Sequence, residues 1–262
     1  MTAPNDSTPS HSVATTSPVR LPRTAALGPG SGGQPRLLID APAGAAEIYL
    51  HGATVTSWIP CGGSEVIFTS RQAVFDGATA IRGGIPLCLP EFGVGINGNA
   101  VPKHGWARIA PWRLRTVTST DDGGVRALLS VSRDRLTALY EVEVGQTLRL
   151  GLSLRNDGTE PRTVEAAAHT YLSVHDVTAS VISGLDAAAY SDNLARNPQE
   201  SRRVQEGDVK ISGPVDRIYD SAAPIAVIDP GRRRTIRIDK RNAPSTIVWN
   251  PWSTYSTPLP DM

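Results

Sequence analysis

The chain has 262 residues, of which 40% are hydrophobic and 19% charged, so it is long enough to bury a full core. No apolar run could cross a bilayer, and a formal charge of +1 gives no overall attraction for nucleic acid or anionic lipid, so we expect neither partner. Two cysteines, Cys61 and Cys88, exclude a disulfide framework, and the start of the chain shows no secretory signal, so we expect a cytoplasmic protein.

Residues 1–35 are predicted to form a disordered, low-complexity tail. They contain six Pro, five Ser, five Thr and four Gly and no aromatic residue. Such a composition buries too little apolar surface to offset the entropy of ordering. The tail also has no amphipathic or aromatic docking pattern, so a tail without function is favoured over a binding segment.

Residues 36–262 are predicted to form one all-β domain. Apolar and polar residues alternate between turns rich in Gly, Pro, Asn and Asp, as in half-buried strands of antiparallel sheets. Between residues 148 and 155, for example, leucines alternate with Arg, Gly and Ser. Many short strands without a repeated sequence period predict a sandwich or a barrel. The clearest predicted strands are 46–50, 54–59, 126–132, 140–144, 147–155, 164–168, 225–228, 235–238 and 246–249.

Two segments, 81–108 and 169–176, interrupt this alternation. The first is dense in Gly and Pro, but it also carries apolar, aromatic and charged residues, which argues against disorder. Long irregular loops inside a compact domain are usually functional. We therefore expect the functional site here.

Two histidines stand out by their neighbours. His104 lies between a lysine and a Gly-Trp pair, and His169 follows an apolar strand. Each of them alone would be structural about as often as catalytic. His175 has no metal-ligand spacing to His169, so no metal site is expected. The sequence also has no phosphate loop and no dinucleotide-binding turn, so no cofactor is expected.

Two arginines, Arg82 and Arg108, lie in the first of these irregular segments. The guanidinium group offers planar, paired donors that suit a phosphate or a carboxylate. Histidine exchanges a proton near neutral pH. Together these residue types predict a small anionic substrate that undergoes proton transfer.

These residues belong to a series of short motifs that resembles the glucose-6-phosphate 1-epimerases, the hexose-6-phosphate mutarotase branch of the aldose 1-epimerase family. Any one motif is weak, but five in the same order are specific. The motifs are GATV at 52–55, IRGGIP at 81–86, HGWAR at 104–108, HTY at 169–171 and VWNPW at 248–252. The resemblance covers about residues 48–261.

The resemblance implies a large antiparallel β-sandwich of the galactose mutarotase-like type. It also implies that the protein interconverts the α and β anomers of glucose 6-phosphate by acid–base ring opening. Its partner would then be a small hexose 6-phosphate, and we expect a monomer.

The resemblance also implies roles for single residues. His169 resembles the general acid that protonates the ring oxygen, and His104 and Asp216 resemble ligands of the sugar. Arg82 and Arg108 resemble binders of the anion or of hydroxyl groups. Structural alternatives stay open: either arginine could be an ion-paired scaffold residue, and Asp216 could cap a turn.

One family feature has no counterpart in the sequence. The family's general base is a glutamate in a late strand, beyond the position that Asp261 matches, and the sequence given ends at Met262. We therefore expect the domain to lack its C-terminal strands and its activity to be impaired, either as a fragment of a longer reading frame or as a product without its base. Two alternatives are a non-catalytic sugar-phosphate binding module and a mutarotase of unphosphorylated aldoses.

Overall fold

Antiparallel strands provide almost all the regular structure of the chain. The structure is a computed structural model that describes residues 19–197, 200–253 and 261. Within these residues the helices are short 3-10 turns, and none could span a membrane. The turns are η1 (Ser31–Gly33), η2 (Ala107–Ile109) and η4 (Pro230–Arg232). The prediction of a mostly β fold is confirmed.

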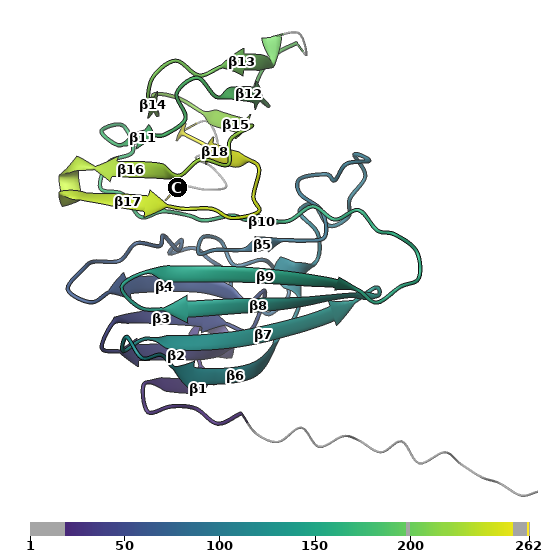
Figure 1. The fold of residues 1–262 in the computed structure, drawn as a ribbon, viewed down its shortest axis with the longest axis vertical. Helices are drawn as coiled ribbons and strands as arrows, with labels where there is room; N and C mark the ends of the chain where they lie inside the picture. Colours follow the sequence, from purple (N-terminus) through teal and green to yellow (C-terminus); the bar gives the residue numbers. More distant parts are fainter. Residues whose placement is uncertain (1–18, 198–199, 254–260, 262) are drawn as a thin grey trace, which may run out of the picture.

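Two four-stranded sheets form a sandwich in the N-terminal half, at the bottom of Figure 1. The first contains, in spatial order, β1 (Ala25–Pro29), β2 (Pro35–Ala41), β3 (Gly44–Tyr49) and β4 (Thr54–Pro60). The second contains β6 (Arg113–Ser119), β7 (Val125–Arg133), β8 (Leu136–Val144) and β9 (Leu148–Asn156). Their inner faces share one apolar core, to which Ile39, Ile48, Leu129 and Tyr140 each contribute a side chain that is at most 1% exposed.

The alternation in the sequence explains how these strands face the core. In β8, Leu136, Ala138, Tyr140 and Val142 are buried, whereas the residues between them are partly or fully exposed. Burying one large apolar side chain contributes about 1.5–3 kcal/mol. The alternating leucines of β9 are less buried, because β9 is one of the two edge strands of its sheet.

Two further four-stranded sheets form the C-terminal half, at the top of Figure 1. One contains β14 (Val209–Lys210), β11 (Val181–Ser183), β16 (Ile225–Asp229) and β17 (Arg234–Ile238). The other contains β13 (Arg202–Val204), β12 (Ala189–Asp192), β15 (Val215–Tyr219) and β18 (Thr246–Asn250). A second apolar core, with Leu185, Tyr190 and Tyr219, lies between them.

A two-stranded ladder lies between the two halves (Figure 1). It pairs β5 (Leu87–Cys88) with β10 (Ala167–Ala168). The irregular segments 81–108 and 169–176 extend from this ladder. The ladder therefore brings the two segments of the expected site side by side.

Two sequence predictions need correction. The predicted tail is too long, because residues 25–29 form β1, which pairs with β2 along its whole length. β1 buries little side-chain surface and is joined to β2 through the backbone, so composition carries no sign of it. The rest of the predicted tail up to residue 18 lies outside the described residues. In the predicted strand 164–168, only 167–168 pair as a strand.

Candidate active site

His169 stands at the end of β10, where the chain leaves the ladder. Its backbone N–H donates to the carbonyl of Pro86 at 3.0 Å. The imidazole stacks on the ring of Tyr171, with centroids 4.5 Å apart and planes at 20°. Trp249, on β18 of the C-terminal half, makes an edge contact with the imidazole, with ring centroids 5.7 Å apart. Aromatic contacts from two different segments thus fix the position of the imidazole.

His104 is held by an unusual local backbone. Both His104 and Gly105 have positive φ angles, of 68° and 70°. A Cβ atom on Gly105 would lie 2.2 Å from the carbonyl oxygen of Leu89, so only glycine allows the loop to approach β5 this closely. The backbone N–H of His104 donates to the carbonyl of Gly93 at 2.7 Å, which closes the loop between them.

The ring of His104 has a defined tautomer in its neutral form. Its Nδ1 accepts a hydrogen bond from the N–H of Gly93 at 3.1 Å, so the proton of the neutral ring is on Nε2. The rings of His104 and His169 lie at right angles, with centroids 6.4 Å apart. Two imidazoles from separate loops therefore meet at one place.

A cavity of about 180 Å³ lies beside the Tyr171–Trp249 contact. Its walls are formed by Ala80, Ile81, Arg82, Pro86, Arg108, Tyr171 and Trp249. The Nη2 of Arg108 donates to the carbonyl of Lys103 at 2.8 Å. Among the described residues, the buried Nε of Arg108 has no hydrogen-bond acceptor. Arg108 therefore brings a positive charge to the cavity wall, which suits an anion there.

Asp216 reaches the same place from β15. It pairs with Trp249 across the β15–β18 ladder, so the two side chains project from the same face of that sheet. Asn193 Nδ2 donates to its carboxylate at 2.9 Å. Desolvation lowers the pKa of His169, and the Asp216 charge opposes that shift. All five residues singled out in the sequence thus lie at or beside one site: His169, His104, Arg82, Arg108 and Asp216.

Burial and positive charge hold both histidines neutral at pH 7. Desolvation, Arg108, Lys103 and His169 together lower the pKa of His104 to about 4. The pKa of His169 is also lowered, chiefly by desolvation and further by Arg108, while its own backbone and Asp216 oppose the shift. Neutral His104 offers its Nε2–H as a donor. Because its pKa is lowered, protonated His169 is a stronger acid than an ordinary imidazolium.

Substitution of Arg108 by glutamine is expected to raise the pKa of both His104 and His169, because the Arg108 charge lowers both. An NMR titration that follows the ring Cε1–H signals measures both values. Arg113→Gln, on the exposed face of β6, is the matched control and should leave both unchanged. Unchanged histidine pKa values in Arg108→Gln would contradict this electrostatic account.

Two aromatic residues that line the site, Tyr171 and Trp249, belong to the quoted motifs, but the sequence analysis assigned them no role. Tyr171 stands two residues after His169 in an extended segment, so period-two spacing already places both side chains on one face. Trp249 belongs to a predicted strand, but nothing in the sequence pairs it with Asp216. The described residues contain no group of three or more His, Cys, Asp or Glu side chains that could hold a metal ion.

Comparison with known proteins identifies the family. Residues 35–261 match the family model described as "Aldose 1-epimerase". The chain is 34% identical over 235 residues to a Cenchrus ciliaris protein named "Putative glucose-6-phosphate 1-epimerase", covering 82% of this chain and 70% of that protein. The crystal structure of a "putative mutarotase" from Salmonella typhimurium superposes with a TM-score of 0.82 at 26% identity, covering 93% of this chain and 83% of that one.

A more distant structure confirms the predicted type of fold. A galactose mutarotase-like protein from Clostridium acetobutylicum superposes with a TM-score of 0.69 over 86% of this chain and 83% of that one. At 11% identity this likeness concerns the fold alone. The match to the family model and the relative at 34% identity also assign the chain to a family. The chain belongs to the aldose 1-epimerase family.

Proposed function

We propose that this protein is a hexose-6-phosphate 1-epimerase that interconverts the α and β anomers of glucose 6-phosphate. One observation carries the proposal: His169, whose ring centroid is 6.4 Å from that of His104, stacks on Tyr171, which lines a cavity together with Arg82 and Arg108. The imidazoles suit proton transfer at a sugar, and the arginines suit its phosphate. The names of relatives that share most of the chain's length point to the same substrate.

Anomer exchange needs two proton transfers, one at each oxygen of a single hemiacetal carbon. A proton reaches the ring oxygen as the bond from that oxygen to C1 breaks, and the anomeric hydroxyl loses its proton as the aldehyde forms. The aldehyde group then rotates about the C1–C2 bond. The former ring oxygen attacks the other face of C1, and the ring closes as the other anomer. In this proposal His169 donates to the ring oxygen, while the Nε2–H of His104 hydrogen-bonds to the sugar beside it. The resemblance assigns the general base to a strand that follows Asp261, so the described residues supply the acid and the sugar contacts.

Substrate binding would also favour protonation of His169, the general acid. Arg108 lowers the His169 pKa, so a phosphate bound beside Arg108 would neutralise part of that effect. The Asp216 carboxylate acts in the same direction. Protonated His169 is then populated best when a phosphosugar fills the site.

Phosphosugar preference depends on the arginines in this proposal. Arg108→Ala is expected to lower the affinity for glucose 6-phosphate by about 10- to 100-fold, because a hydrogen bond to a charged group contributes about 1.5–3 kcal/mol. Arg82→Ala should act in the same direction, and Arg115→Ala on β6 is the control. Polarimetry or exchange NMR on fresh α-glucose 6-phosphate and on α-glucose gives the rates, and calorimetry gives the affinities.

Three results would replace the proposal. Acceleration of glucose exchange without acceleration of glucose 6-phosphate exchange would indicate a mutarotase of unphosphorylated aldoses. Tight binding of glucose 6-phosphate without acceleration, also in a chain extended through the strand that follows Asp261, would indicate a sugar-phosphate binding module. Absence of both binding and acceleration would contradict either assignment to phosphosugars.

A further inference from the structure

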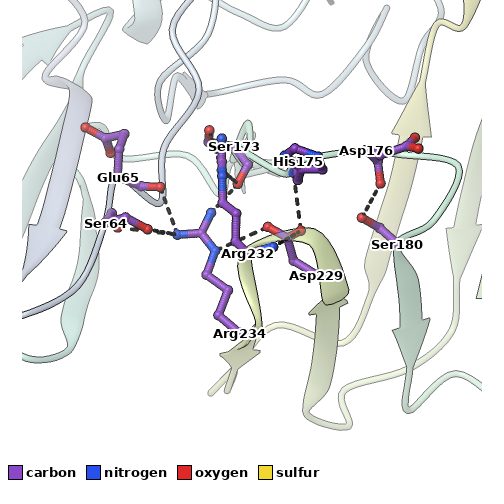
Figure 2. A network of polar contacts seen from close by, with 9 residues as sticks. All are labelled: Ser64, Glu65, Ser173, His175, Asp176, Ser180, Asp229, Arg232 and Arg234. Carbon is purple, nitrogen blue, oxygen red and sulfur yellow. Dashed lines mark hydrogen bonds and ion pairs between the residues drawn. The ribbon is translucent and has the colours of Figure 1, made fainter.

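A network of polar contacts around the Arg234–Asp229 ion pair connects the C-terminal half to the segment that follows His169 (Figure 2). Arg234, the first residue of β17, lies with its Nε 3.4 Å from Oδ2 of Asp229, and their side chains are 16% and 1% exposed. The guanidinium donates to the carbonyls of Glu65 at 2.9 Å, Ser64 at 3.3 Å and Ser173. One side chain thus joins three backbone oxygens from two distant parts of the chain.

The other groups of this network hold the same end of the segment. Oδ1 of Asp229 accepts from the backbone N–H of His175 at 3.3 Å and of Arg232 at 3.4 Å. Arg232 Nη1 donates to the carbonyl of Ser173 at 2.5 Å and to its hydroxyl at 2.8 Å. Residues 173–175 are therefore held by two arginines and one buried carboxylate.

Backbone hydrogen bonds connect this end to His169. The backbone N–H of Ser173 donates to the carbonyl of Val66, and the N–H of Phe68 donates to the carbonyl of Tyr171, both at 2.9 Å. The N–H of Tyr171 donates to Gly84 at 2.9 Å, and Tyr171 carries the ring on which His169 stacks. Two segments of the chain, 66–68 and 171–173, are joined by these hydrogen bonds. Arg234 holds both segments at the same end, through the carbonyl of Glu65 on one and of Ser173 on the other. A shift at Ser173 therefore displaces Tyr171 and, with it, the imidazole.

We propose that Arg234, fixed by Asp229, is a positioning residue for the general acid His169. The inference rests on the function proposed above, in which His169 protonates the sugar. The guanidinium suits this task because it presents five donors in a rigid plane, whereas a lysine offers one compact charge. Small misplacements far from the reacting atoms can cost about a hundredfold in rate.

The test compares Arg234→Lys and Asp229→Asn with Arg237→Lys. The control makes the same substitution on the same strand, at an exposed ion pair with Asp239 whose side chains are 70% and 63% exposed. Asp229→Asn keeps an oxygen acceptor for the His175 and Arg232 N–H groups while removing the charge, so it carries the test if Arg234→Lys does not fold. Two readouts are used: the His169 Cε1–H resonance, and kcat and KM for glucose 6-phosphate.

The proposal predicts that the His169 resonance moves in both network variants and not in Arg237→Lys, because its stacking on Tyr171 changes. It also predicts that kcat falls by about 10- to 100-fold with KM within about twofold. A folded Arg234→Lys or Asp229→Asn protein with an unmoved His169 resonance overturns the proposal, even if its melting temperature is lower. The resonance decides the positioning role whether or not the parent protein accelerates anomer exchange, and the proposed function fails if a chain extended through the strand that follows Asp261 gives no acceleration.

Discussion

Substitution of His169 by alanine is expected to remove most of the acceleration of glucose 6-phosphate anomer exchange. General acid catalysis by a positioned side chain contributes about 10²–10⁴-fold, and His169 is the imidazole that we assign to the ring oxygen. The Tyr171 stack and the Trp249 contact position its imidazole, so the alanine variant leaves the ring oxygen without its assigned proton donor. Exchange NMR or polarimetry on freshly dissolved α-glucose 6-phosphate measures the rate.

A second variant separates proton transfer from loss of shape. His169→Gln keeps a polar side chain of similar reach but cannot exchange a proton, so its rate should fall as in the alanine variant. Calorimetry should show glucose 6-phosphate binding to both variants, because Arg82 and Arg108 are unchanged. Full rate in either variant would refute the assignment of His169 as the acid.

Substitution of Gly105 by alanine is expected to lower the free energy of unfolding by more than about 2 kcal/mol. The position has φ +70°, and the new Cβ would lie 2.2 Å from the carbonyl oxygen and 2.4 Å from the carbonyl carbon of Leu89. Both atoms belong to the backbone of the central ladder region, so they cannot rotate away. Urea denaturation measures the loss.

Gly98→Ala is the matched control for this substitution. Gly98 lies in the same segment with φ +71°, but nothing lies within 4 Å of its new Cβ. It therefore pays only the cost of the left-handed conformation, which is about 1–2 kcal/mol. The Gly105 variant should also weaken glucose 6-phosphate binding, since His104 precedes it. Equal stability losses at the two positions would show that the contact with Leu89 is not what requires glycine.

The sequence predicts best the strands whose two faces have different environments. The alternation within 126–132 and 140–144 corresponds to β7 and β8, which bury one face in the sandwich core. β1 was missed, because an exposed edge strand has no such contrast. β12 and β13 were missed for a related reason: β12 has mostly half-buried positions, and β13 is exposed throughout.

The site was predicted through residue types and ordered motifs rather than through spacing. His104 and His169 are 65 positions apart in the sequence, and their meeting depends on the β5–β10 pair, which has only two residues in each strand. Arg234 could not have been found in this way. It acts through main-chain carbonyls far from it in sequence, and any residue type offers such a carbonyl.

The closed base of the loop between Gly93 and His104 has a consequence for how this protein can vary. Two hydrogen bonds join these residues, so the position of His104 is fixed at the neck of the loop rather than by its tip. The tip carries exposed Ile96 and Val101, and doubling the length of a flexible loop costs only about 0.6 kcal/mol. Insertions or exchanges between Ile96 and Val101 are therefore expected to leave the position of His104 unchanged, which makes this stretch of the loop the natural place for divergence and for engineering.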